Sequence, residues 1–131
     1  MEQLAPILKA LADPSRVRIV NILSIASLSV CDLQTVLGFP QPFISRHLAF
    51  LRKVRFVRDV RQGPRVVYSL ARAHPFSLAI TQFLRASVLH SPRLQADVER
   101  LESCRDSGRL AADSPQAATW EESGEDQDAA V

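Results

Sequence analysis

The sequence predicts a mainly α-helical domain that contains one small β-hairpin, and three observations support this fold class. Apolar residues recur at helical spacing through most of the first 106 residues. The period changes to β-branched and aromatic runs only between Phe56 and Leu70, around a glycine–proline turn signal. Acidic residues, serine and glycine become common near the C-terminus. We therefore expect one folded domain over residues 1–106 and a mostly disordered acidic tail over residues 107–131.

Two helices are expected at the start of the chain. Leu4, Ile7 and Leu11 share one face of the first helix. Asp13 then stands before a proline, so it is a good N-cap for a second helix whose first position suits proline. The second helix is apolar around much of its surface, which predicts that it is central and buried. Residues 24–28 form a weakly polar break after it.

The next two helices have the arrangement of a helix-turn-helix. Ser29 is an N-cap candidate, and Gly38 suits the position after the helix that follows. Pro40 and Pro42 mark the start of another helix, whose apolar stripe is Ile44, Leu48, Leu51 and Val54. Its other side is polar and basic, as a helix that reads the DNA major groove requires. The candidate DNA contacts are Gln41, Ser45 and Arg46, with Phe43 placed to touch a thymine methyl.

A β-hairpin is expected directly after this helix, with strands at residues 56–61 and 65–70. It carries Arg58, Arg61 and Arg65 around its turn. A hairpin in this place can simply cover the core. Three arginines beside a helix-turn-helix instead favour a wing that contacts DNA, so the expected fold is a winged helix-turn-helix.

Residues 76–91 form a predicted helix that is apolar around much of its circumference. A small domain cannot cover such a helix alone, so we expect a homodimer with this helix at its centre, helped by residues 4–12. A weaker amphipathic segment follows from Leu94 to Cys104. The terminal helices are thus the expected dimer interface.

The net charge of +2 hides a strong asymmetry. Residues 1–93 hold 13 basic and four acidic residues, a net charge of +9, whereas residues 94–131 hold three basic and ten acidic residues, a net charge of −7. The basic charge of residues 1–93 indicates a polyanionic partner, and double-stranded DNA is the first candidate. We expect a cytoplasmic protein without a membrane partner, because no apolar run approaches a membrane span and the N-terminus lacks the features of a signal peptide.

Several stretches together resemble one family. Residues 8–19, the segment Ser29-Val30-Cys31-Asp32-Leu33, the stretch from Gln41 to Arg52 and the end of the wing at residues 67–70 are similar to ArsR-type (ArsR/SmtB) winged-helix repressors. The resemblance covers about residues 4–91. It implies a homodimeric transcriptional repressor that binds an inverted-repeat operator and is released by an inducer at a separate site. Two residues depart from the pattern: Pro40 stands where the family often has serine, and Phe43 is bulkier than usual.

The resemblance also suggests which inducers to consider, because members of the family bind them through known residue positions. Metalloid sensors of the family carry three cysteines where this chain has Ser29, Cys31 and Gln34, so two of the three thiolates are missing. The zinc ligands of other members are missing too, because residues 76–91 offer His90 and no acid. Cys31 and Cys104 resemble the two-cysteine arrangement of persulfide- and redox-sensing members. A two-thiol As(III) or Sb(III) site is the rival hypothesis, and each cysteine alone is also compatible with a structural role.

Two other classes of protein remain as alternatives. An enzyme needs paired reactive groups in a pocket, but the basic part of the chain holds only four scattered acids and no catalytic motif, so we expect no enzyme. The other alternative is a winged-helix protein-interaction module without DNA binding. Such a module would lack base-reading and basic residues on the recognition helix, whereas this chain has Gln41, Ser45 and Arg46 there.

Overall fold

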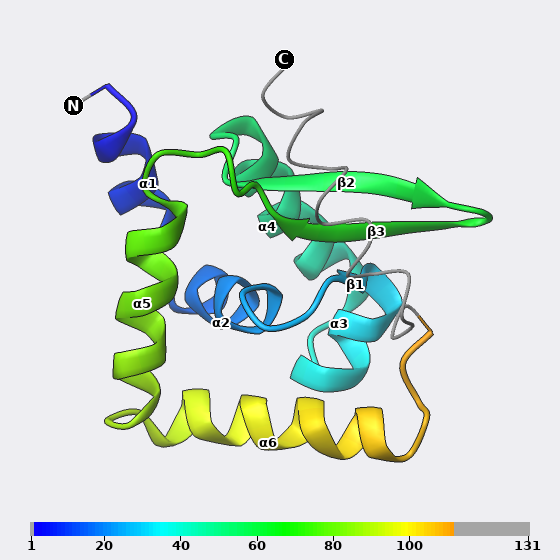
Figure 1. Cartoon of the computed structure of the whole chain (residues 1–131). Helices are drawn as coiled ribbons and strands as arrows, with labels where there is room; N and C mark the ends of the chain where they lie inside the picture. The colour runs from blue at the N-terminus through cyan, green and yellow to red at the C-terminus, as the bar shows by residue number, and fades with distance from the viewer. Residues whose placement is uncertain (1, 112–131) are drawn as a thin grey trace.

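The computed structural model of the chain describes residues 2–111 and confirms the winged helix-turn-helix fold (Figure 1). Helix α2 lies in the middle of the view, α5 and α6 border it on the left and below, and the hairpin projects to the right. The elements in order are α1 (Leu4–Ala10), α2 (Pro14–Leu23), β1 (Leu28–Ser29), α3 (Val30–Leu37), α4 (Gln41–Lys53), β2 (Val57–Gln62), β3 (Arg65–Leu70), α5 (Ser77–Val88) and α6 (Pro92–Asp106).

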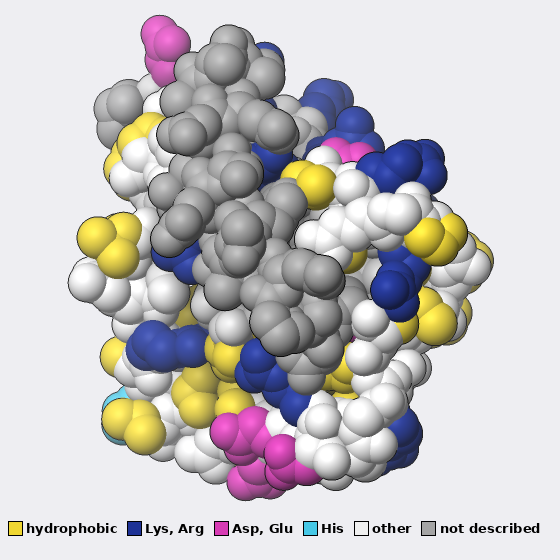
Figure 2. All heavy atoms as spheres, turned by 45° about the vertical axis from the view of Figure 1, so that its right-hand side comes forward, with side chains coloured by type: hydrophobic (Ala, Val, Ile, Leu, Met, Phe, Trp, Pro, Cys, Tyr) yellow, Lys and Arg dark blue, Asp and Glu magenta, His cyan; other side chains and the backbone are white. Residues whose placement is uncertain are grey.

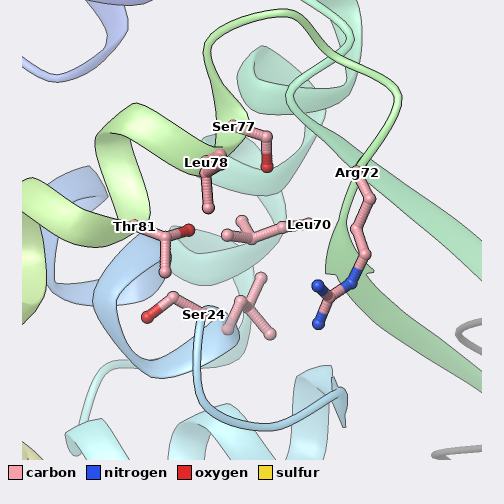
Figure 3. Close-up of a pocket in the computed structure, with 7 residues that line it drawn as sticks. Ser24, Leu70, Arg72, Ser77, Leu78 and Thr81 are labelled. Atoms are coloured by element: carbon pink, nitrogen blue, oxygen red, sulfur yellow. The ribbon is translucent and has the colours of Figure 1, made fainter.

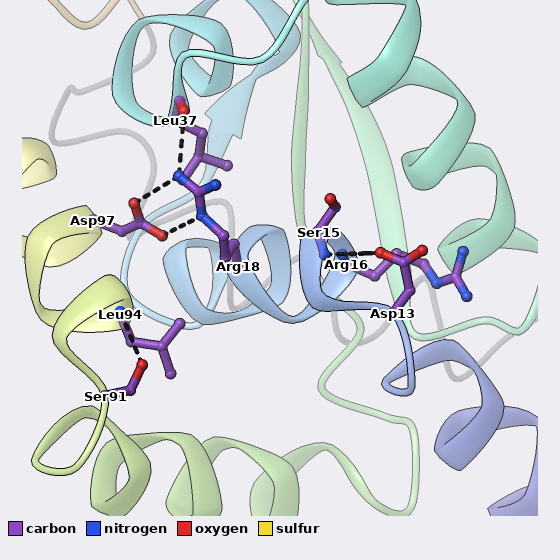
Figure 4. Close-up of polar contacts among 8 residues, drawn as sticks. All are labelled: Asp13, Ser15, Arg16, Arg18, Leu37, Ser91, Leu94 and Asp97. Carbon is purple, nitrogen blue, oxygen red and sulfur yellow. Dashed lines mark hydrogen bonds and ion pairs between the residues drawn. The ribbon is translucent and has the colours of Figure 1, made fainter.

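The start of α2 follows the sequence-based prediction. The Asp13 carboxylate accepts hydrogen bonds from the backbone N–H groups of Ser15, at 2.8 Å, and Arg16, at 3.2 Å (Figure 4). Burial alone would raise the pKa of Asp13, but these bonds to the carboxylate hold it below its usual value. The second half of the helix is buried, so α2 is the central helix of the domain as predicted.

The turn between α3 and α4 depends on one glycine. Ser29 caps α3 by accepting a 3.1 Å hydrogen bond from the backbone N–H of Asp32. At the other end Gly38 has φ 77°, in the left-handed region, and donates its N–H to the carbonyl of Gln34 at 2.8 Å. Any other residue at Gly38 would be strained, because a side chain disfavours this backbone conformation.

The sheet contains a strand that the sequence analysis did not predict. Residues 24–28 were expected to be a polar break, but Leu28 and Ser29 form β1, which pairs antiparallel with Tyr68 and Val67 of β3. The strand order is β1-β3-β2. Two residues are too few to show a period of two, so only the tertiary contact with β3 identifies this strand.

The hairpin forms where the sequence predicted it. Gln62 pairs with Arg65, which leaves Gly63 and Pro64 as a two-residue loop. Gly63 has φ 62°, the left-handed value that a tight hairpin turn requires at its first central position. The wing is therefore a short, regular two-stranded ribbon that continues from the three-stranded sheet.

Helix α5 has an inner side and an exposed apolar side. Leu84 is buried in the core, whereas Leu78, Phe83 and Leu89 are 69%, 66% and 74% exposed. Leu8 of α1 is also exposed. The predicted apolar helix over residues 76–91 is thus confirmed as an element, and the structure divides its apolar residues into these two groups.

The chain folds back onto the domain after α6. Leu110 belongs to the hydrophobic core, and the backbone N–H of Ala111 donates to the Asp32 carboxylate at 2.8 Å. These residues belong to the predicted acidic tail, whose remaining part, residues 112–131, lies outside the described residues. None of the helices within residues 2–111 combines the length and apolar character needed to cross a membrane.

A buried ion pair joins α2 to α6. Arg18 donates from Nε and Nη2 to the two carboxylate oxygens of Asp97, at 2.8 and 3.0 Å, and Asp97 is 3% exposed (Figure 4). The same guanidinium donates to the carbonyl of Leu37 at 3.3 Å and lies over the Phe39 ring at 4.6 Å. One side chain therefore connects α2, the end of α3, the turn before α4 and α6.

We expect Asp97→Ala to lower the free energy of unfolding by about 3 kcal/mol, because it leaves the Arg18 charge without its buried partner. The matched control is Asp59→Ala, which breaks the exposed Arg52–Asp59 pair and should change stability by no more than about 0.5 kcal/mol. Replacing both buried partners, with Arg18→Met and Asp97→Leu, should restore much of the loss. Urea unfolding followed by circular dichroism measures all three. Equal losses for Asp97→Ala and Asp59→Ala would contradict this role.

Candidate nucleic-acid interface

Helix α4 is anchored through one apolar side. Ile44, Leu48 and Leu51 are buried in the core, at most 1% exposed. With about 3.6 residues per turn, these three residues fall on one stripe, as the sequence predicted. The stripe holds the helix against the domain and leaves the other positions on the outside or on the two flanks.

The outward side of α4 is basic. Arg46 is exposed on the side opposite the buried stripe, and its guanidinium carbon lies 5.7 Å from the centre of the Phe43 ring. Ala49 and Lys53 share this outward side and are also exposed. Lys53 was not among the residues predicted from sequence, although helical spacing from Arg46 would have identified it.

One flank of α4 faces the wing. Gln41 is exposed and Ser45 is half-buried on this side. Arg52 follows them along the same flank and pairs with Asp59 of β2, at 3.5 Å between Arg52 Nε and Asp59 Oδ1. The pair is solvent-exposed, so it contributes little to stability. It does place α4 and β2 side by side.

The other flank of α4 is aromatic. Phe43 is half-buried and packs between Phe39, with ring centroids 4.9 Å apart, and His47, at 4.6 Å in an edge-to-face arrangement. The residue predicted to touch a thymine methyl therefore lies away from the wing, on the opposite flank from Gln41 and Ser45. The predicted readers do not share a single face.

Arg16 of α2 packs against this aromatic flank of α4. Its Nε donates to the carbonyl of Ala10 at 2.7 Å, and its guanidinium lies 4.2 Å from the centre of the Phe50 ring. Its Nη1 lies 3.4 Å from Nδ1 of His47. Burial lowers the pKa of His47; Asp13 raises it, while Arg16 and Arg46 lower it further. The net effect favours the neutral imidazole beside the two arginines.

The wing separates its three arginines. Arg61 and Arg65 are exposed near the turn, where Arg61 pairs with Val66 and Arg65 with Gln62. Arg58 is half-buried at the base, opposite Ser69, and shares its face of the ribbon with Arg65. Arg61 projects from the other face. The predicted cluster around the turn thus consists of Arg61 and Arg65, with Arg58 set apart.

Arg55 is a basic residue that the sequence analysis did not identify. It lies between α4 and β2 with φ 64°, a left-handed conformation that disfavours a side chain. The N–H of the next residue, Phe56, donates to the carbonyl of Leu51 at 2.9 Å, which closes the end of α4. A glycine is usual at such a position, so nothing in the local sequence reveals this turn. It leaves Arg55 exposed at the junction of helix and wing.

Basic side chains gather on the wing side of the molecule. Figure 2 turns the wing side of the molecule toward the viewer, and several Lys and Arg side chains lie in its upper right part. The largest acidic group visible on this face lies at the lower edge, where α6 runs in Figure 1. A polyanion is therefore favoured on the side of α4 and the wing.

The two cysteines lie in different environments. Both are free thiols, but Cys31 is exposed on α3 and Cys104 is fully buried on α6. They are not joined by a disulfide. Within residues 2–111, no three His, Cys, Asp or Glu side chains gather closely enough to hold a metal ion. The structure thus offers one accessible thiol on α3 and no preformed metal cluster in its described part.

The chain is similar to known bacterial regulators. A family model described as "Bacterial regulatory protein, arsR family" matches residues 13–59. The "Transcriptional repressor SmtB homolog" of Synechocystis is 40% identical over 77 residues, which cover 59% of this chain and 58% of the relative. The chain thus spans little more than half the length of that relative. The "HTH-type transcriptional regulator NmtR" of Mycobacterium tuberculosis is 37% identical over 92 residues, which cover 70% of this chain and 72% of that protein.

A solved structure shares the fold. The transcriptional repressor PagR of Bacillus anthracis superposes with a TM-score of 0.57 and 33% identity, over 63% of this chain and 93% of that one. The share of this chain that superposes is larger than the segment that the family model matches.

Proposed function

The chain belongs to the ArsR family of bacterial regulatory proteins, and we propose that it is a transcriptional repressor that binds operator DNA as a homodimer. The observation that carries this proposal is α4 itself. Its buried stripe fixes it to the core, while Arg46 and Lys53 project outward beside a wing with two exposed arginines. A basic helix so presented suits the major groove, and the wing suits the adjacent phosphates.

The residues have separate roles in this proposal. Arg46 reads a base edge in the major groove, with Gln41 and Ser45 contacting bases or phosphates on the wing-side flank. Phe43 is half-buried against its aromatic neighbours, so it offers the DNA at most its exposed edge, where a thymine methyl would fit. Arg61 and Arg65 meet phosphates or the minor groove, and Arg58 supports the base of the wing.

The exposed apolar residues of α1 and α5 supply the dimer contact. Leu8, Leu78, Phe83 and Leu89 present large apolar side chains to solvent, which is unusual for four residues on two elements of a small domain. A second copy related by a two-fold axis would cover them. The two α4 helices would then enter successive major grooves about 34–36 Å apart on an inverted repeat.

The inducer is proposed to act through a thiol. Cys31 is accessible and belongs to α3, which packs directly against both α4 and α6. Persulfide transfer, oxidation or As(III) binding at this residue would therefore alter the support of the DNA-reading helix. Cys104 is buried, so its participation requires local opening of α6.

The first prediction concerns base reading. Arg46→Ala should weaken binding to a duplex enriched from a random-sequence pool by about 1–3 kcal/mol, because it removes a contact to a base edge. Fluorescence anisotropy measures the affinity, and Arg93→Ala on the exposed side of α6 is the matched control. If no duplex is enriched and the chain binds no DNA, the protein-interaction module becomes the better hypothesis.

The second prediction separates the wing from the helix. Arg61→Ala should lower the affinity for selected and unrelated duplexes alike, and should reduce the dependence of log K on log salt by about one unit. Phosphate contacts carry charge but no sequence information, which is why both duplexes should respond. A changed base preference with an unchanged salt slope would instead make Arg61 a sequence reader.

The third prediction concerns assembly. Phe83→Glu combined with Leu89→Glu should give a folded monomer, because both side chains are exposed and the core is untouched. Leu84→Glu should instead unfold the chain, because Leu84 is 2% exposed. Sedimentation gives the mass and circular dichroism the helix content, with Gln95→Glu as a surface control. A wild-type monomer at micromolar concentration would exclude this dimer.

The fourth prediction concerns release. Polysulfide or As(III) should lower operator affinity about 5- to 150-fold, the range of a typical allosteric coupling. Cys31→Ser should abolish the response and preserve DNA binding. Cys104→Ala shows whether the buried thiol takes part. Release that persists in Cys31→Ser would place the inducer elsewhere on the molecule.

A further inference from the structure

A groove of about 410 Å³ lies between α1 and the last turn of α4. Among the described residues it is lined by Ala5, Pro6, Lys9, Phe50, Lys53 and Val54. Lys9 and Lys53 are the two lysines of the whole chain, and both are exposed. The lining includes none of the residues assigned above to the dimer contact. The groove therefore combines an apolar lining with a positive charge on each of its two helices.

Arg16 of α2 holds the two walls of this groove together. Its guanidinium lies 4.2 Å from the centre of the Phe50 ring on α4. It also donates to two carbonyls at the end of α1, from Nε to Ala10 at 2.7 Å and from Nη2 to Lys9 at 3.4 Å. Phe50 is half-buried, so part of its ring remains accessible in the groove. The groove is thus a fixed feature of the fold.

An occupant that matches this groove needs a large apolar group next to negative charge. Residues 112–131, which lie outside the described part of the chain, hold six acidic residues and no Lys or Arg. They include the only tryptophan of the protein, Trp120, which is followed directly by Glu121 and Glu122. An indole ring offers a large apolar area, and carboxylates pair with lysines. This segment therefore has the chemistry that the groove accepts.

The chain is also long enough to bring this segment to the groove. Ala111 donates its N–H to the carboxylate of Asp32, in the first turn of α3, and α3 packs against α4. The nine residues 112–120 span up to about 30 Å when extended. A helix of 13 residues such as α4 is about 20 Å long. The segment can thus follow α4 from its contact with α3 to the groove at its end.

We propose that residues 120–122 dock into this groove. The Trp120 ring packs against Phe50 and Val54, while Glu121 and Glu122 pair with the two lysines. Ion pairs at the surface contribute little, so burial of the indole provides most of the attraction. The segment is covalently attached, which gives it an effective concentration of about 1 mM, so a contact with a dissociation constant of about 0.1 mM keeps it docked about nine-tenths of the time.

The position of the groove makes the docked segment a competitor of DNA, and this part rests on the proposed function. Lys53 lies on the outward side of α4 together with Arg46. Acids docked there occupy the basic surface that phosphates would meet, and they repel the DNA. DNA affinity is then reduced by the undocked fraction, which is about a tenfold reduction.

Trp120 itself reports docking, because the full chain contains no other tryptophan. In the wild type we expect its fluorescence emission to be shifted to the blue, and its quenching by acrylamide to be weaker, than in the chain unfolded in urea. Lys9→Glu combined with Lys53→Glu should lower the docking equilibrium constant about tenfold, because two ion pairs become repulsive contacts. Trp120 would then be exposed in about half of the molecules. Arg61→Glu combined with Arg93→Glu makes the same change of net charge away from the groove and should leave the emission unchanged.

A charge swap distinguishes docking from a general loss of structure. Adding Glu121→Lys and Glu122→Lys to the two lysine reversals should restore the blue-shifted emission. Emission and quenching in the wild type that equal those of the unfolded chain would overturn the proposal. So would equal responses to the lysine and arginine reversals, because Trp120 would then be protected elsewhere. Protection that is lost on dilution would assign the groove to the segment of a second copy and overturn docking within one chain.

DNA affinity tests the competition separately. Trp120→Ala should raise the affinity for the selected duplex about tenfold, and Thr119→Ala is the matched control. Adding the duplex to the wild type should shift the Trp120 emission toward that of the exposed ring, because competition is reciprocal. A docked segment with unchanged DNA affinity in Trp120→Ala overturns the competition alone. A chain that docks its segment but binds no DNA overturns the proposed repressor function and leaves the docking standing.

Discussion

The arrangement of the domain depends on the ion pair between Arg18 and Asp97. Two charge-assisted bonds of 2.8 and 3.0 Å hold α6 against α2, and the same guanidinium reaches the end of α3 and the Phe39 ring. A buried pair of this kind adds little net stability compared with a well-packed apolar pair, but breaking it is costly. Its effect is therefore to specify one relative position of the helices. The pair connects the turn before α4 to α6, which also packs into the core through Leu101 and Cys104.

Helix α4, which follows this turn, makes different contacts on each of its sides. Its buried stripe gives it a fixed depth in the domain. The aromatic flank packs against α2 through Arg16, and the other flank meets the wing through Arg52 and Asp59. The outward side is the most open to a partner, and it carries Arg46 and Lys53. Both flanks thus hold the outward side rigid, which a base-reading helix requires.

Helix α5 connects the core of the domain to its exposed apolar side. Its inner side contributes Leu84 to the core, and its outer side carries exposed Phe83 and Leu89. Its first residues, Ser77 and Leu78, line a cavity of about 280 Å³ beside the end of β3 (Figure 3). A change at the cavity or at the outer side therefore acts on the same element. Helices packed in this way respond by small rigid shifts rather than by local deformation.

Sequence alone determined the local features of this protein. The caps at Asp13 and Ser29, the left-handed glycine at Gly38, the buried stripe of α4 and the hairpin all follow from rules that span a few residues. The basic character of α4 and of the wing was equally visible, since charge needs no fold to be counted. Family resemblance extended these local features to a complete winged helix-turn-helix.

Tertiary structure decided what depends on distant parts of the chain. Strand β1 exists only because β3 lies beside it, and the Arg18–Asp97 pair joins residues 79 positions apart. Periodicity could not tell that Leu84 points inward while Phe83 remains exposed, nor that Cys31 is accessible while Cys104 is buried. The spacing of apolar residues identifies the faces of one helix or strand, but not the element that each face contacts. Those contacts are determined by packing, which involves all elements at once.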